Sequence, residues 1–420
     1  MSRIRIVGGT ITKTTVGDHN IYSEGNIVYN SGKAITETSD VGISYGEPKD
    51  APPPERIAKC LVEYRPCKDW KGEFGIDWPR KRDSKMAVDV PYNGIIGKYG
   101  AIYGSEPKAV FTPDNKAYLN HLNQYSFFNC YRGKYYIPNV TLMAGQTAFF
   151  DVITEVEEEP EKLHYVYDTA VFELTILKKL TSTKGKHYDE KALKIKCLKQ
   201  FDKKQSIRII ATKKKYLEKV GEIFILPNNN IKEIKILFIP VNYNGIKGSV
   251  KGNEVQILSN ALNQSYIKGD IKSMSEIKVG GWWYDLFFTA KDKKGNKLMD
   301  TSNMKSIHKT LDDVFFEKKE NEIYKDCYRL YMLPNGKLNG IAENVGGNSR
   351  VAVVYQNRND STAPHELMHA MGLYHTFDND GLFTYKFCNT DNIMDYTHQI
   401  GKARFSTNRW QWKILNSGIR

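Results

Sequence analysis

Three of the nine histidines fall within the sequence HELMHAMGLYH, which begins at His365. Positions i and i+4 share one face of a helix, so His365 and His369 can point at a common centre. His375 lies six residues further on, about 1.7 turns, and therefore on another face. The helix must end before it, and Gly372 can adopt the positive φ that a sharp turn requires. The spacing predicts a short helix, a turn at Gly372 and three convergent imidazoles.

Three neutral imidazoles in this pattern are typical ligands of a catalytic zinc ion, because they leave one coordination position for water. We therefore expect one Zn²⁺ bound by His365, His369 and His375. Glu366 follows the first ligand, where its carboxylate can reach that water without coordinating the metal. We predict that it is the general base for attack of zinc-bound water on a peptide carbonyl, and that it then protonates the leaving amine. The alternative is an ordinary helix whose histidines are core or surface residues.

A second motif follows in DNIMDYTH, around Met394. Together with HELMHAMGLYH it resembles the zinc motif and the methionine turn of the metzincin clan of zinc metallopeptidases. The resemblance implies an α/β catalytic domain in which Met394 forms a hydrophobic floor under the imidazoles and is not a ligand. Tyr396 matches the position at which astacin-like and serralysin-like members carry a tyrosine that approaches zinc and stabilises the oxyanion. A tyrosine that only packs or donates a hydrogen bond is the alternative.

The resemblance also implies an edge strand that lines the cleft and pairs antiparallel with an extended substrate. The segment RVAVVYQ is expected to supply it, although an ordinary strand would use the same residues: Val351, Ala352, Val353, Val354 and Tyr355. One departure from the clan is Pro364, which requires the helix to begin close to His365, with Ser361 or Thr362 as its cap. The sequence DNDG at Asp378 could hold Ca²⁺, but a turn is the simpler interpretation.

The rest of the chain predicts a multidomain protein with a β-rich N-terminal region. Residues 1–46 are rich in Gly and Thr and predict either a spike-like β arm or a plain β-meander. Four prolines make 47–56 a linker. Short aromatic and β-branched runs predict a small β module over 57–125 and an Ig-like β-sandwich over 126–230. The α/β domain with the zinc motif is expected over 231–420.

Charge and cysteine content exclude few classes of function. The 61 Lys and Arg against 48 Asp and Glu give a net charge of +13, which permits acidic partners. The basic run at 213–215 has no aromatic platform beside it, so we expect no nucleic-acid partner. Six scattered cysteines without a CxxC pair argue against a disulfide scaffold and a cysteine zinc ribbon. We expect no membrane span and no cleavable signal peptide.

The N-terminal region resembles modules that front bacterial effectors of type VI or related contractile secretion systems. The resemblance lies in its Gly/Thr-rich start and in the stretches CLVEYRPCKDWKGEFGIDWPR and ALKIKCLKQF. This implies an endopeptidase made in the bacterial cytoplasm and secreted or delivered to a target cell as a toxin. Its substrate would be a polypeptide, and spike or needle components would be its partners. Two alternatives remain: a structural spike-tip or adhesion component with a non-catalytic zinc domain, and a zinc amidase acting on cell-wall crosslinks. The sequence leaves the oligomeric state open.

Overall fold

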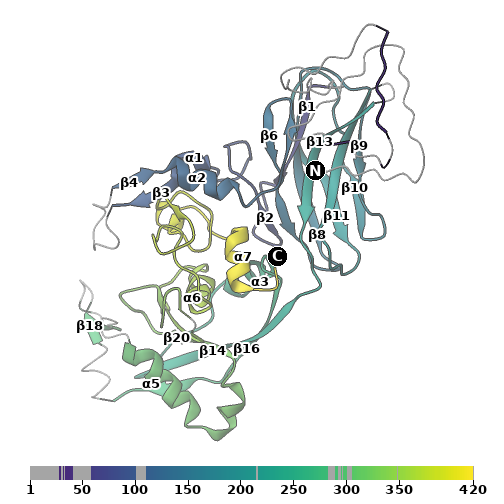
Figure 1. Ribbon diagram of the computed structural model, residues 1–420. Coiled ribbons are helices and arrows are strands. Elements are labelled where there is room, and N and C mark those ends of the chain that lie inside the picture. The colour runs from purple at the N-terminus through teal and green to yellow at the C-terminus, as the bar shows by residue number, and fades with distance from the viewer. Residues whose placement is uncertain are drawn as a thin grey trace. The chain divides into compact units, whose positions relative to one another are not determined.

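The computed structural model describes residues 28–29, 32, 34–40, 58–100, 110–213, 216–281, 289–291, 295, 297–299, 305–347 and 349–419 (Figure 1). The chain divides into two units, Met1–Arg56 and Ile57–Arg420. The few described residues of the first unit contain no strand. Most of the expected arm over 1–46, and all of the linker over 47–56, lie outside the described residues. The second unit is mostly β, with several sheets and few helices, as the sequence predicted.

Two sheets of this unit form a β-sandwich. One has the order β1-β8-β11-β10 and the other the order β2-β7-β13-β12-β9, with β7 and β13 the one parallel pair recorded in either sheet. In β12, Ile207, Ile209 and Ala211 are buried and alternate with more exposed residues, as a strand with one face on a core requires. The strands are β1 (Cys60–Pro66), β2 (Gly75–Asp77), β7 (Asn139–Thr141), β8 (Thr147–Val156), β9 (Lys162–Val166), β10 (Phe172–Ile176), β11 (Gly185–Cys197), β12 (Gln205–Lys213) and β13 (Tyr216–Ile225).

This pairing corrects the expected division between a module over 57–125 and a sandwich over 126–230. Strand β1 pairs along its whole length with β8, and β2 pairs with β7, so strands from both segments share each sheet. The residues of β1 and β2 also belong to the same hydrophobic core as β8 and β13. A sequence of short strands reveals where strands begin and end, but their partners are set by contacts far apart in the chain.

A second large sheet is formed by strands from the second half of the chain. Its order is β15-β14-β20-β22-β21, and β16 and β17 also pair with β14. Most pairs are parallel, while β15 and β21 run antiparallel to their neighbours. The strands are β14 (Lys232–Tyr243), β15 (Ile246–Lys247), β16 (Ile267–Ser273), β17 (Ile277–Val279), β20 (Tyr328–Leu333), β21 (Gly340–Ala342) and β22 (Val351–Tyr355).

Helices cover both faces of this sheet (Figure 1). On one face, α6 (Thr362–Ala370) packs against β22, and α3 (Glu254–Asn263) packs against β16 and α6. Ala352 and Val354 of β22 belong to the hydrophobic cluster on this face. On the other face, α5 (Lys305–Phe316) packs against Val353 and Tyr355 of the same strand. Every residue of β22 is therefore buried, which explains its continuous apolar sequence.

Smaller elements join the two large parts. A three-stranded sheet combines β3 (Ile96–Tyr99) and β4 (Phe111–Pro113) with β23 (Thr384–Tyr385). The others are α1 (Tyr92–Ile95), α2 (Asn115–Leu122), β5 (Phe127–Cys130), β6 (Gly133–Tyr136), β18 (Thr289–Lys291), β19 (Lys297–Met299), η1 (Lys319–Tyr324), η2 (Thr397–Ile400) and α7 (Arg409–Leu415). No helix among the described residues is long and apolar enough to span a membrane. All six cysteine thiols are free, and five of them are buried.

Candidate metal centre

Helix α6 begins at Thr362 and ends at Ala370, so it is short, as Pro364 required. Ser361 occupies the cap position, but its side chain does not cap the helix. Its Oγ instead donates to Asn359 Oδ1 at 2.6 Å and accepts from Arg404 Nε at 2.7 Å. Gly372 has φ +106° two residues beyond the helix, where a residue with a side chain would be strained. The turn lets the chain double back and bring His375 to the other two histidines.

The three imidazoles converge as predicted. Nε2 of His369 lies 3.1 Å from Nε2 of His365 and 3.1 Å from Nε2 of His375, and the candidate ligand atoms all lie within 4.8 Å of one another. Tetrahedral ligands 2.0–2.1 Å from zinc are separated by about 3.3 Å, so the set fits such an ion. All three side chains are buried. Among the described residues, no other cluster of three or more His, Cys, Asp or Glu has ligand atoms close enough to hold a metal.

The Nδ1 atoms point away from this centre, each towards an acceptor. His365 Nδ1 lies 2.8 Å from Ile393 O, and His369 Nδ1 lies 2.6 Å from Leu373 O. His375 Nδ1 lies 3.0 Å from Asp378 Oδ2. At His369 and His375 this acceptor holds the proton at Nδ1 and leaves the Nε2 lone pair free for a metal. At His365, Arg404 Nη1 also lies 3.0 Å from Nδ1, and because a guanidinium can only donate, it competes with Ile393 O for that atom. Burial lowers the pKa of His365 and His369 well below its usual range, which also favours the neutral, ligating form.

Glu366 is buried beside the edge of the large sheet. A Cβ atom added to Gly340 of β21 would lie 2.7 Å from Glu366 Cγ and 3.0 Å from Oε1, so the glycine makes room for this carboxylate. Burial raises the pKa of Glu366 to about 8, while the positive charge of Arg404 acts in the opposite direction. A cation held by the histidines would lower it further.

Met394 and Tyr396 lie on the turn that follows. Met394 is buried in the hydrophobic cluster that contains Leu367 and Met368 of α6, and its role as a floor under the imidazoles stays a prediction. Tyr396 Oη lies 3.0 Å from His375 Nε2, so the structure brings the tyrosine to the imidazole cluster. Its ring packs against Phe377 at 5.1 Å and Phe387 at 5.8 Å between centroids. Burial raises the pKa of Tyr396, so the phenol stays protonated and can donate.

The expected substrate strand is corrected by the pairing. Val351, Ala352, Val353, Val354 and Tyr355 form β22, which pairs with β20 on one side and β21 on the other. Strand β22 lies inside the sheet with a neighbouring strand on each side, so it cannot pair with a substrate. The end of the sheet is β21, Gly340–Ala342, the strand against which Glu366 lies. Its three residues, Gly340 to Ala342, are too few to show the alternating or continuous apolar pattern by which a strand is predicted.

Two further residues touch the ligands and lie outside the sequence motifs. Asp378 belongs to the DNDG sequence considered for calcium, and its Oδ2 accepts from the backbone N–H of His375 at 3.0 Å as well as facing Nδ1. Gly381 N–H donates to Asp378 O at 3.2 Å, so the DNDG sequence forms a turn. Arg404 is buried, donates to Asp395 O at 2.7 Å and lies 3.0 Å from His365 Nδ1. Burial lowers its pKa to about 10, so it stays charged at neutral pH.

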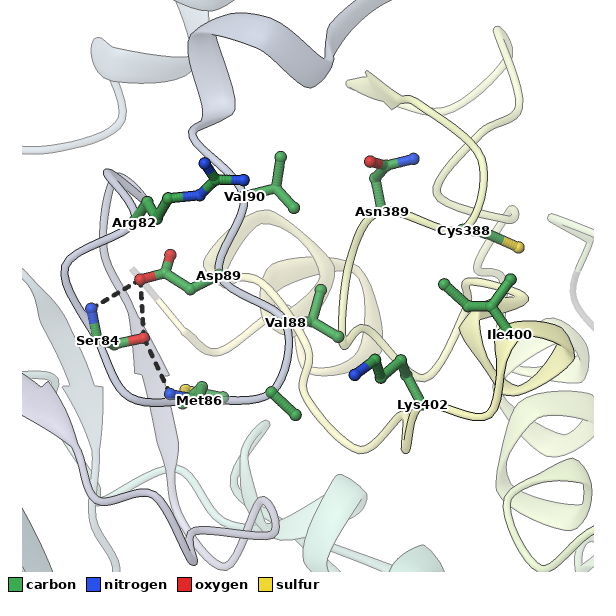
Figure 2. Close-up of a pocket in the computed structure, with 11 residues that line it drawn as sticks. Arg82, Ser84, Met86, Val88, Asp89, Val90, Cys388, Asn389, Ile400 and Lys402 are labelled. Carbon is green, nitrogen blue, oxygen red and sulfur yellow. Dashed lines mark hydrogen bonds between the residues drawn. The ribbon is translucent and has the colours of Figure 1, made fainter.

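A pocket of about 380 Å³ lies between residues 82–90 and residues 388–402 (Figure 2). Asp89 accepts two hydrogen bonds from Ser84, whose N–H and Oγ both donate to Asp89 Oδ2, at 2.7 and 2.8 Å. Val88 and Ile400 line the pocket from opposite segments. Cys388 lines it too, and its Sγ donates to Tyr396 O at 3.2 Å, so one wall of the pocket is bonded to the turn that carries Tyr396.

No protein-family profile matches the chain, and no curated protein is significantly similar to it in sequence. The resemblance to the metzincin clan therefore depends on the two sequence motifs alone.

Proposed function

We propose that the chain is a zinc-dependent endopeptidase in which His365, His369 and His375 hold the ion and Glu366 is the general base. One observation carries the proposal: three buried Nε2 atoms converge, and each Nδ1 faces an acceptor on the far side of its ring. A structural zinc site has four protein ligands. Here the described residues bring three histidines together and add a buried carboxylate, which favours a catalytic site.

Each residue has a distinct role in the proposed reaction. A zinc ion bound here supplies Lewis acidity, which polarises a peptide carbonyl and makes water more acidic. Glu366 accepts the proton of the attacking water and passes it to the leaving amine. Tyr396 Oη is a neutral donor beside the ligands and can stabilise the carbonyl oxygen as negative charge develops on it. Met394 belongs to the apolar support of α6.

Strand β21 is the proposed binding site for the substrate backbone. It ends the sheet, and an extended peptide can add to such an edge by main-chain hydrogen bonds. Gly340 of this strand lies against Glu366, so a peptide paired there would pass close to the general base. The role first assigned to β22 thus passes to its antiparallel neighbour.

The decisive experiment combines a peptide library with a chelator. Purified full-length protein should cleave peptides, and the chelator should abolish cleavage. Glu366→Gln should retain zinc and lose cleavage, while the same change at the exposed Glu320 should alter neither. Full activity in Glu366→Gln would contradict the mechanism. Cleavage of cell-wall crosslinks in place of peptides would favour the amidase, and no chelator-sensitive cleavage at all would favour a non-catalytic spike-tip component.

The delivery of this peptidase into a target cell, through spike or needle components, stays a prediction. It depends on the N-terminal resemblance alone, and a secretion assay with and without residues 1–56 would test it.

A further inference from the structure

A segment of the first half of the chain packs against the loop that joins the third histidine to the methionine turn. We call residues 77–100 and 110–125 the clamp segment and residues 375–394 the ligand loop. Strand β3 of the clamp segment pairs antiparallel with β23 of the ligand loop, Gly97 opposite Thr384 and Ile96 opposite Tyr385. Lys386 N–H donates to Ile95 O at 2.7 Å beside this pairing. Neighbouring parts of the same two segments, 82–90 and 388–389, contribute to the walls of the pocket in Figure 2.

The first anchor between them is a buried ion pair. Arg80 Nη2 donates to Asp391 Oδ1 at 3.0 Å and to Oδ2 at 3.3 Å, and both side chains are only 5% exposed. The guanidinium also lies 3.7 Å over the Trp78 ring and donates to Val88 O at 3.2 Å. Asp391 is therefore held from the clamp segment. Two residues further along the chain is Ile393, whose carbonyl faces His365 Nδ1.

The second anchor is a pair of hydrogen bonds between Tyr99 and Asn379. Tyr99 N–H donates to Asn379 Oδ1 at 3.1 Å, and Asn379 Nδ2 donates to Tyr99 O at 2.8 Å. Phe387 N–H donates to the Tyr99 hydroxyl at 2.7 Å. Asn379 directly follows Asp378, whose carboxylate faces His375 Nδ1. The backbone that carries this acceptor is thus tied to β3.

Two of the three candidate ligands therefore have acceptors on backbone that the clamp segment contacts. Ser406 Oγ also donates to Asp391 Oδ1, at 2.8 Å. The acceptors of His365 and His375 lie within two residues of Asp391 and Asn379, and the clamp segment holds both of these. His369 is different, because its acceptor is Leu373 O, in the turn that directly follows its own helix. Outer-shell partners of this kind orient a metal ligand, and their loss typically costs about 10–100-fold in metal affinity.

We propose that the clamp segment is a permanent part of the metal centre, with Arg80 and Asn379 as positioning residues. It is then neither a pro-segment removed to release activity nor a separable carrier. The proposal rests on the proposed zinc site but does not depend on which bond the protein hydrolyses. A purely structural clamp would stabilise the fold and leave zinc affinity unchanged.

Zinc affinity of the full-length protein distinguishes a clamp segment that orients the metal ligands from one that only stabilises the fold. It is measured by competition with a chromophoric chelator, on variants shown to be folded by circular dichroism. Asn379→Ala should bind zinc about 10-fold more weakly or worse. Asn389→Ala is the matched control, because Asn389 lies in the ligand loop and its amide donates within that loop, to Phe387 O at 2.7 Å.

Arg80→Met tests the buried ion pair and should also weaken zinc binding. Its control is Arg329→Met, because Arg329 is similarly buried and pairs with Asp312, outside both the clamp segment and the ligand loop. That control should lose stability but keep zinc affinity. If Arg80→Met does not fold, Asn379→Ala still decides the question. Zinc affinity within twofold of wild type in folded Asn379→Ala would overturn the proposal.

The outcome is independent of the proposed reaction. If zinc affinity falls as expected but the wild-type protein cleaves nothing, the clamp stands and the peptidase proposal fails. If the wild-type protein cleaves peptides and Asn379→Ala binds zinc normally, the peptidase stands and the clamp fails. A wild-type protein that binds no zinc would overturn both.

Discussion

Asp378 Oδ2 lies 3.0 Å from His375 Nδ1 and accepts the backbone N–H of the same residue at 3.0 Å. One carboxylate oxygen thereby fixes both the ring and the backbone of the third ligand. Asp378→Asn should weaken zinc binding by about 10-fold or more, because a neutral amide is a poorer partner for the imidazole proton. The same change at the exposed Asp380 should have no effect. Equal zinc affinities in the two variants, measured by chelator competition, would remove this role from Asp378.

Gly340→Ala should lower turnover without releasing zinc. The added methyl group would press on Glu366 Cγ and on Thr362 Cγ2, at 2.7 and 2.9 Å, and so displace the carboxylate. A catalytic group misplaced by about 1 Å can cost about 100-fold in rate. Gly94→Ala, where nothing lies within 4 Å of the new atom, is the control. Zinc content and kcat of both variants check the prediction, and an unchanged kcat in Gly340→Ala would contradict it.

Tyr396→Phe should reduce kcat by about 100-fold and leave KM and zinc affinity close to wild type. The substitution keeps the ring packed on Phe377 and Phe387 and removes only the hydroxyl. Loss of one donor to a developing oxyanion typically costs about 100–1,000-fold. Steady-state kinetics on a cleaved peptide provide the measurement. If kcat is preserved, Tyr396 is a packing residue.

His121 should make the fold sensitive to mild acid. Burial among Tyr92, Phe383 and Tyr385 lowers the pKa of His121 to about 3, against about 6.5 in the unfolded chain. Between these values the unfolded state binds the proton and the folded state does not. Stability therefore falls as pH drops from 6.5 towards 3, by up to about 1.4 kcal/mol per pH unit from this group.

His121→Phe keeps an aromatic ring in this cluster and should flatten that slope. Urea unfolding at pH 7, 6, 5 and 4 gives the comparison, with His187→Phe near the surface as the control. Parallel slopes for the wild-type protein and His121→Phe would show that another group is responsible.

The parts of the site that depend on local spacing could be predicted from the sequence. His365, His369, Gly372 and His375 lie close together in the chain, so helix geometry and one turn determine where their side chains meet. The substrate strand could not be predicted in this way. The apolar sequence of β22 signals burial on both faces, which places it inside a sheet, while the edge strand is a short segment around Gly340.

The contacts that Arg80 and Arg404 make could not be predicted from the sequence, for a related reason. Arg80 and Asp391 are 311 positions apart, and Arg404 is 39 positions from His365. No periodicity links such pairs, because the fold of the whole unit brings them together. The assignment of β1 and β2 to a separate module failed in the same way, since their partners β8 and β7 follow only after α2.

The number of residues between Arg80 and Asp391 also determines how long after Arg80 the ribosome synthesises Asp391. At about 5–20 residues per second, a ribosome needs roughly 15–60 s to make the intervening 311 residues. During that interval the arginine exists without its carboxylate, and the backbone that orients His365 has not yet been synthesised. A chain interrupted just before Asp391 already contains the three histidines, but it lacks the ion pair with Arg80 and the Ile393 carbonyl that faces His365 Nδ1. The supporting contacts of the candidate site are therefore complete only when nearly the whole chain has been made.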